Sequence, residues 1–172
     1  EKMYALELLS SMIVSLGEEF QVYASEVLTV VREVLFTEQE PGIRGMAAAL
    51  LGLLAQNSGA DEEAQIVLTV LVGQIECEVD SYASKEIISA IEMCTCKILE
   101  RIDDNDLNKV LSSLMGRFQA SLREREMQRA ELTLQYGESG HNVEQALFEI
   151  DYMEEEVRFA IATSINVILS KS

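Results

Sequence analysis

Four consecutive side chains, Asp103-Asp104-Asn105-Asp106, are the group best suited to catalytic chemistry. Carboxylate oxygens hold Mg²⁺, and clusters of this kind support diphosphate chemistry in all-helical synthases. Those enzymes place the cluster within a helix that faces a deep aromatic cavity. Here it precedes an apolar helical pattern, and aromatic residues make up only 6% of the chain. Because Asp is a preferred N-cap residue, we predict that the cluster starts a helix. A magnesium-dependent helical enzyme is the alternative.

Three cysteines, Cys77, Cys94 and Cys96, and the single histidine, His141, are the other candidates for a metal or nucleophilic site. A tetrahedral zinc site needs about four ligands, and these cysteines lack the paired spacing of zinc ligands. Cys94 and Cys96 lie in an apolar helical pattern, and His141 follows a glycine-containing segment. We therefore predict reduced, buried thiols, a surface histidine, no metal, no cofactor and no enzymatic activity.

The charge balance favours a basic partner. The 172 residues include 30 acidic and 13 basic side chains, which give a formal net charge of −17. Such a surface repels nucleic acids and anionic membranes and attracts segments rich in lysine and arginine, although solubility alone is an alternative explanation. No apolar stretch is long enough for a membrane span. The arginines at 117, 123, 125 and 129 alternate with glutamates, which predicts a mixed, solvated face rather than a nucleic-acid stripe.

Two patterns recur along the chain. The first is an apolar motif that reads VLTVVREVL at 27–35, VLTVLVGQI at 67–75 and VLSSLMGRF at 110–118. The second has the spacing of one helix face and starts at Lys2, Arg44 and Glu86, 42 residues apart, then again at Arg158 after 72 residues. Helix pairs with a period of about 40 to 47 residues are the signature of HEAT repeats. The extra residues fall between Ala120 and Tyr152, which predicts a charged insertion.

These patterns predict an all-α fold, a single superhelical HEAT-repeat α-solenoid of about three and a half helix pairs. Gly17, Pro41 and Ser58-Gly59 mark helix ends and starts. Because the chain begins at Glu1 and the seventh helix lacks a partner, we expect a piece of a longer solenoid with Ile161, Ile165 and Ile168 exposed. The predicted repeats are 1–40, 41–79, 80–142 with the insertion and a partial 143–172, built from helices at 2–16, 20–36, 41–57, 61–77, 81–102, 106–134 and 143–170.

Two sets of polar residues are candidate partner contacts. In a HEAT solenoid the second helix of each pair lines the concave side, where carboxylates, hydroxyls and amides can bind an extended basic peptide. The polar positions in and around the recurring apolar motifs are Glu26, Thr29, Glu33, Gln65, Thr69, Asn108 and Ser112. The acidic block of the insertion is a second candidate landing site for lysine or arginine: Glu149, Asp151, Glu154, Glu155 and Glu156. Ordinary solvated helix positions are the alternative for both sets.

The residues resemble a family. The segment Leu16-Gly17-Glu18-Glu19-Phe20, followed by Tyr23 and VLTVVREVL, is similar to a central-to-late repeat of the importin-β (karyopherin-β) superfamily. The stretch Ile43-Arg44-Gly45-Met46-Ala47-Ala48 resembles the opening of the next repeat there, and SLREREMQRAE resembles the charged insertion of its importin-four and importin-five branch.

The resemblance implies a nuclear transport receptor that shuttles between cytoplasm and nucleus. Such a receptor binds cargo proteins with basic nuclear localisation signals, releases them to the GTP-bound Ran GTPase and contacts Phe-Gly nucleoporins. It catalyses no reaction and binds neither nucleic acid nor membrane. A HEAT scaffold of another kind, in a phosphatase or a chromosome-organising complex, is the alternative reading of the same repeats.

Overall fold

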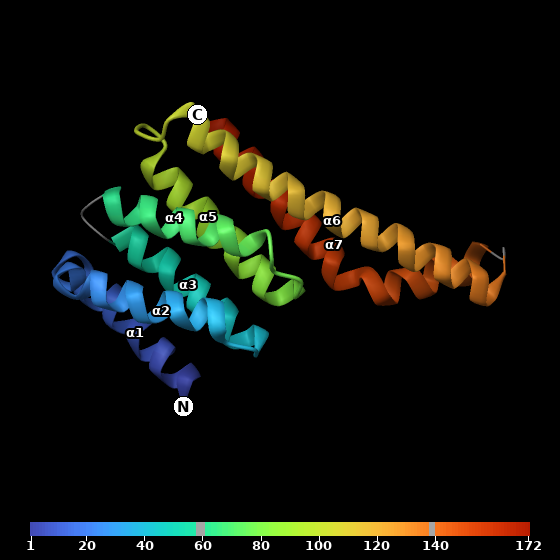
Figure 1. Cartoon of the computed structure of the whole chain (residues 1–172), viewed down its shortest axis with the longest axis horizontal. Coiled ribbons are helices and arrows are strands. Elements are labelled where there is room, and N and C mark those ends of the chain that lie inside the picture. Colours follow the sequence, from blue (N-terminus) through green and yellow to red (C-terminus); the bar gives the residue numbers. More distant parts are fainter. Residues whose placement is uncertain (58–60, 138–139) are drawn as a thin grey trace.

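The computed structural model describes residues 1–57, 61–137 and 140–172, and in these ranges the chain is helical with no strand (Figure 1). Two of the predicted helix breaks, Ser58-Gly59 and the segment around residues 138–139, lie wholly or partly outside the described residues. The elements are α1 (Lys2–Leu16), the 3₁₀ helix η1 (Gly17–Tyr23), α2 (Ala24–Thr37), α3 (Pro41–Asn57), α4 (Asp61–Ile75), α5 (Ser81–Ile98), α6 (Asp104–Tyr136) and α7 (Gly140–Lys171).

Short local signals set several helix ends. Gly17 ends α1 with a φ of 53°, a left-handed conformation that glycine adopts without strain. Pro41 is the first residue of α3, where its missing N–H costs no hydrogen bond. The side chains of Asp80 and Asp103 accept hydrogen bonds from backbone N–H groups in the first turns of α5 and α6, so the predicted capping by Asp103 is confirmed. The predicted helix 20–36 differs: a 3₁₀ helix occupies Gly17–Tyr23, and α2 begins only at Ala24.

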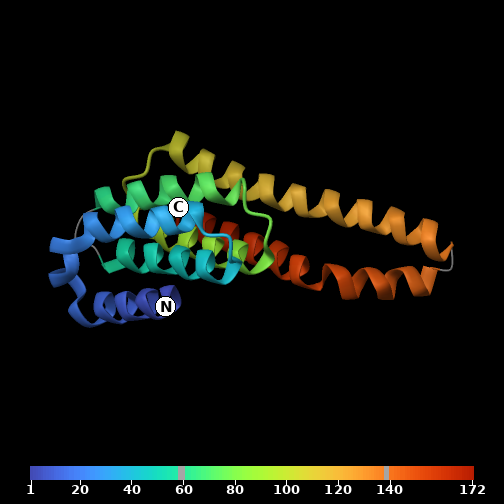
Figure 2. The same cartoon turned by 60° about the horizontal axis from the view of Figure 1, so that its bottom comes forward.

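The helices form two layers, which Figure 2 shows from the side. In one layer α1, α3, α5 and α7 pack in succession, and in the other α2, α4 and α6 do so. Between the layers the most extensive contacts join α2 to α3, α4 to α5 and α6 to α7. Each of these pairs bridges two of the predicted repeat units. Adjacent units are therefore held together within a layer and between the layers.

One continuous apolar core lies between the layers and extends into α7. Its fully buried members include Leu51 of α3, Leu71 of α4 and Ile91 of α5. The prediction of an unpartnered seventh helix with an exposed isoleucine stripe is wrong, because Ile161 and Ile168 are fully buried and Ile165 is half-buried. The stripe is covered because α7 packs on both α5 and α6.

The predicted insertion lengthens two helices instead of adding a new element. Helices α6 and α7 have 33 and 32 residues, and each is about 50 Å long at 1.5 Å per residue. Their paired ends project beyond the body as an arm, residues 120–136 of α6 and 140–152 of α7 (Figure 1). The arm has a small apolar core of its own, formed by Leu132, Val143 and Leu147.

A candidate partner-binding groove between α4 and α6

A groove runs between α4 and α6 in the second layer. Three adjoining hollows share lining residues and form it, and the hollow nearest the arm has a volume of about 370 Å³. Thr69 and Val72 of α4 lie four and seven positions after Gln65, which is the spacing of one helix face, and Glu76 continues this spacing in the turn after α4. We call this surface the α4–α6 groove and define it by Gln65, Thr69 and Val72 of α4, Glu76 in the turn after α4, and Asp106, Asn108, Ser112, Gly116 and Glu124 of α6.

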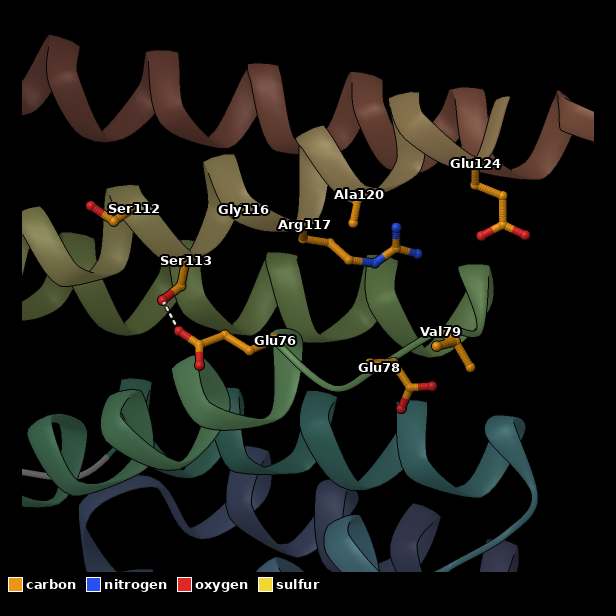
Figure 3. Close-up of a pocket in the computed structure, with 9 residues that line it drawn as sticks. All are labelled: Glu76, Glu78, Val79, Ser112, Ser113, Gly116, Arg117, Ala120 and Glu124. Carbon is orange, nitrogen blue, oxygen red and sulfur yellow. Dashed lines mark hydrogen bonds between the residues drawn. The ribbon is translucent and has the colours of Figure 1, made fainter. Parts of the chain in front are cut away.

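The groove changes character along its length. Near the start of α6 its lining is mostly apolar, and near the arm a larger share of the lining is polar. In the polar part the Ser113 hydroxyl donates a hydrogen bond of 2.6 Å to the Glu76 carboxylate, while Gly116 leaves α6 without a side chain beside them (Figure 3). Glu76 and Glu124 are both exposed. The apolar part, near the start of α6, is lined by Leu68, Val72, Ile98, Ile102 and Val110.

Glu78 and Arg117, two charged side chains that line the groove, are already bound to other residues of the chain. The Arg44 guanidinium donates hydrogen bonds of 2.8 and 2.7 Å to the Glu78 carboxylate, whose side chain is 2% exposed. Burial raises the pKa of Glu78, but the hydrogen bonds from Arg44 and from the backbone N–H of Asp80 outweigh it, so the pKa lies below its ordinary value. Arg117 is bound to Ser84 and Glu154 in the same way. Glu76 and Glu124 are therefore the carboxylates of this wall that face solvent.

The structure separates the predicted contacts into two groups. Gln65, Thr69, Asn108 and Ser112 are exposed and line the groove. Glu26, Thr29 and Glu33 are exposed on α2, outside the groove. Glu76 and Glu124 were not among the predicted contacts. Extending the helix-face spacing of Gln65 and Thr69 by two further turns would have identified Glu76.

Most of the predicted acidic block is bound to the chain's own cations. Asp151 is 4% exposed and accepts hydrogen bonds from Arg158, while Arg125 lies 3.3 Å away. Glu154 binds Arg117, and Glu156 pairs with Lys85. Glu149 and Glu155 are exposed. Asp151 thus belongs to no exposed landing surface, because it pairs with Arg158 of its own helix and the antiparallel course of α6 brings Arg125 beside it.

These contacts form a polar layer at the base of the arm. This ionic seam consists of Ser81 and Ser84 of α5, Arg117, Ser121 and Arg125 of α6, and Asp151, Glu154 and Arg158 of α7. Burial raises the pKa of Glu154, yet hydrogen bonds from Arg117 and two serines leave that pKa below its ordinary value. Arg117 is 8% exposed, which corrects its prediction as part of a solvated face.

Of the remaining candidates for chemistry, the cysteines and the Asp103–Asp106 cluster lie in the described part of the structure, and the side chain of His141 lies outside it. Cys94 is buried and Cys96 half-buried, but Cys77 is exposed just after α4, contrary to the prediction of three buried thiols. Asp106, whose backbone N–H donates a hydrogen bond to the Asp103 cap, pairs with Lys109 at 2.7 Å. Among the described residues no group of three or more His, Cys, Asp or Glu side chains is arranged to hold a metal ion. None of the described helices combines the length and hydrophobicity needed to span a membrane.

Comparisons with protein families, characterised proteins and solved structures find no match to this chain.

Proposed function

We propose that this chain is a HEAT-type α-solenoid segment of an importin-β-like nuclear transport receptor, and that its α4–α6 groove binds an extended basic segment of a cargo protein. The observation that carries the proposal is the continuous groove in which exposed Glu76 and Glu124 accompany Gln65, Asn108 and Ser112. The recurring helix-pair pattern and the family resemblance of the sequence support the same reading.

An extended peptide fits the size and chemistry of this surface. From Asp106 to Glu124 the groove follows α6 for about 27 Å, which matches about eight residues of extended chain. Lysine or arginine side chains would bind Glu76 and Glu124 through charge-assisted hydrogen bonds. Side-chain amides and hydroxyls would bind the peptide backbone, which has free N–H and C=O groups when extended. An aliphatic residue of the ligand would pack over Leu68 and Val110.

In this proposal the chain makes and breaks no covalent bond. The complete receptor would release its cargo to the GTP-bound Ran GTPase, contact Phe-Gly nucleoporins and shuttle between cytoplasm and nucleus. The net charge of −17 favours basic protein partners over nucleic acids and anionic membranes. A HEAT scaffold of a phosphatase or chromatin complex is the second candidate, since it shares the repeats but needs no groove for localisation signals.

The test is the fluorescence anisotropy of a labelled lysine-rich localisation peptide titrated with this chain. We expect binding that weakens between about 50 and 200 mM salt, because screening weakens exposed charge pairs. The affinity of a Glu76→Gln, Glu124→Gln variant for the peptide should be lower by at least about tenfold, since the variant loses two charge-assisted hydrogen bonds. Glutamine keeps the shape of both side chains.

Two matched variants locate the binding surface. Glu18→Gln, Glu19→Gln removes two exposed charges from η1 and should change affinity less than about twofold. Glu26→Gln, Glu33→Gln removes the two predicted contacts on α2. Loss of binding in that variant alone would move the site from the groove to α2. Absence of binding at low salt would contradict the proposal and favour the other scaffold.

A further inference from the structure

The α4–α6 groove contains an apolar hollow with the size of one side chain. This hollow has a volume of about 110 Å³ and lies between α4, the end of α5 and the start of α6. Leu68 and Val110, which line it, are 4% and 2% exposed. Asp106 and Lys109 at its rim form an ion pair of 2.7 Å, so their charges cancel. The hollow therefore fits one uncharged aliphatic side chain, such as that of leucine or isoleucine.

Two exposed carboxylates lie farther along the same groove, at distances set by the helices. Helices α4 and α6 run in the same direction past the groove (Figure 1). Glu76, in the turn after α4, follows Leu68 by eight residues and lies about 12 Å farther along the α4 axis. Glu124 follows Val110 by fourteen residues, which is about 21 Å along α6. The apolar hollow is thus followed by a first carboxylate and then by a second one.

These separations match even numbers of residues in an extended peptide. An extended chain advances about 3.3 Å per residue, so four residues cover about 13 Å and six residues cover about 20 Å. Side chains at even spacings also point to the same side of an extended chain. A ligand residue in the apolar hollow therefore directs the residues four and six positions away toward Glu76 and Glu124. Residues at odd spacings point away from the groove.

Gly116 keeps the path between the apolar hollow and Glu124 open. It lies on α6 between Ser113, which binds Glu76, and Ala120 (Figure 3). A Cβ atom on Gly116 would meet no neighbouring atom within 4 Å, so packing within the chain does not require glycine there. Glycine is also less favourable than alanine inside a helix. The missing side chain leaves room for the aliphatic stem of a ligand lysine or arginine.

We propose that the α4–α6 groove selects a spaced motif, which consists of an aliphatic residue and of lysine or arginine four and six positions away in an extended segment. This inference rests on the proposed function and adds a spacing rule to it. The aliphatic side chain fills the hollow beside Leu68 and Val110. The two basic side chains bind Glu76 and Glu124 through charge-assisted hydrogen bonds. A basic segment without the aliphatic residue leaves the hollow empty and binds more weakly.

Six fluorescent ten-residue peptides of the same composition test the spacing rule by anisotropy at about 50 mM salt. Each contains one leucine, two lysines that are two positions apart, and otherwise serine and glutamine. The leucine stands three and five, four and six, or five and seven positions from the lysines, and each spacing is made in both chain directions. In one direction, the four-and-six peptide should bind at least about fivefold more tightly than the other two spacings. Only this peptide fills the hollow and reaches both carboxylates.

Two glycine variants test whether the ligand passes over Gly116. Gly116→Leu places a side chain in the polar hollow and should weaken binding of the four-and-six peptide at least about fivefold. Its circular dichroism should stay helical, because leucine is a good helix former. The matched control is Gly73→Leu, since Gly73 has the same position in the apolar motif of α4, no neighbour within 4 Å and no part in lining the groove hollows. It should change affinity less than about twofold, and equal effects of the two substitutions would contradict the proposed path.

The outcomes separate the spacing rule from the proposed function. Absence of binding by all six peptides and by the lysine-rich localisation peptide would refute both. In the other case the localisation peptide binds and its binding depends on Glu76 and Glu124, while the six peptides bind equally or not at all. The proposed function then stands, and the spacing rule alone is overturned.

Discussion

Two carboxylates on α7 allow a direct comparison between a buried and an exposed ion pair. Asp151 and Arg158 have side chains that are 5% and 7% exposed in the ionic seam. Glu144 of α7 and Arg129 of α6 pair nearer the arm tip, with side chains 50% and 61% exposed. The substitutions Asp151→Asn and Glu144→Gln each remove one negative charge from α7 and change side-chain size little.

The expected costs differ because only one substitution leaves a charge buried. Asp151→Asn removes the anion from Arg158, which remains 6% exposed, and from the nearby Arg125. Removing one partner of a buried pair costs about 3–5 kcal/mol of folding free energy. Glu144→Gln leaves Arg129 in water and should cost less than about 1 kcal/mol. A double variant, Asp151→Leu with Arg158→Met, should recover part of the larger cost, because no uncompensated charge stays buried.

Urea unfolding at neutral pH, followed by circular dichroism, measures both changes in unfolding free energy. Because small domains have a total stability of about 5–15 kcal/mol, the Asp151→Asn chain should lose a large part of its own and remain measurable at low temperature. Amide hydrogen exchange would show whether the arm opens first. Equal costs for the two single variants, within about 0.5 kcal/mol, would refute the argument that the seam is desolvated.

Three further predictions test the packing and the ionisation states. Gly52→Val should cost about 1–3 kcal/mol, because its Cβ position already meets α5, whereas Gly116→Ala, with no neighbour within 4 Å, should gain about 0.5–1 kcal/mol of helix stability; thermal unfolding measures both. Because the pKa of Glu78 is lowered in the fold, its contribution to stability is present above the ordinary value of 4.5 and is lost as pH falls through the lower folded pKa. In urea titrations at several pH values, Glu78→Gln should therefore reduce the loss of unfolding free energy on acidification. A thiol reagent at pH 8 should label exposed Cys77 rapidly and Cys94 only after unfolding, because burial raises the pKa of Cys94 to about 12.

The helices could be predicted from the sequence because their signals are local. Gly17, Pro41 and Asp103 act within one turn of the helix ends that they define. The apolar motif beginning at Val67 likewise indicates a buried helix face without knowledge of its neighbours. Where the sequence prediction failed, at Gly17–Tyr23, seven residues adopt a 3₁₀ helix whose apolar spacing resembles that of an α-helix start.

Contacts between segments far apart in the chain could not be predicted from the sequence. The acidic stretch around Asp151 looks like a solvated block because, apart from Arg158, its cations lie on other helices. Only the antiparallel pairing of α6 and α7 brings Arg125 against it, and only the stacking of α7 on α5 brings Ser81 to Glu154. The burial of Ile161 has the same origin. Sequence periodicity gives the face of a helix that is apolar but not the helix that covers it.

The ionic seam adjoins the α4–α6 groove. Arg117 lines the α4–α6 groove, and its guanidinium binds Glu154 of α7. Glu124, the groove carboxylate nearest the arm tip, lies on the arm itself, while Glu76 lies on the body. A ligand that binds both carboxylates therefore contacts the arm and the body together, and it stabilises this arrangement by RT ln(1 + L/Kd), which rises with the free ligand concentration L. Because α6 is one uninterrupted helix from groove to arm, this effect needs no rearrangement of the chain between them.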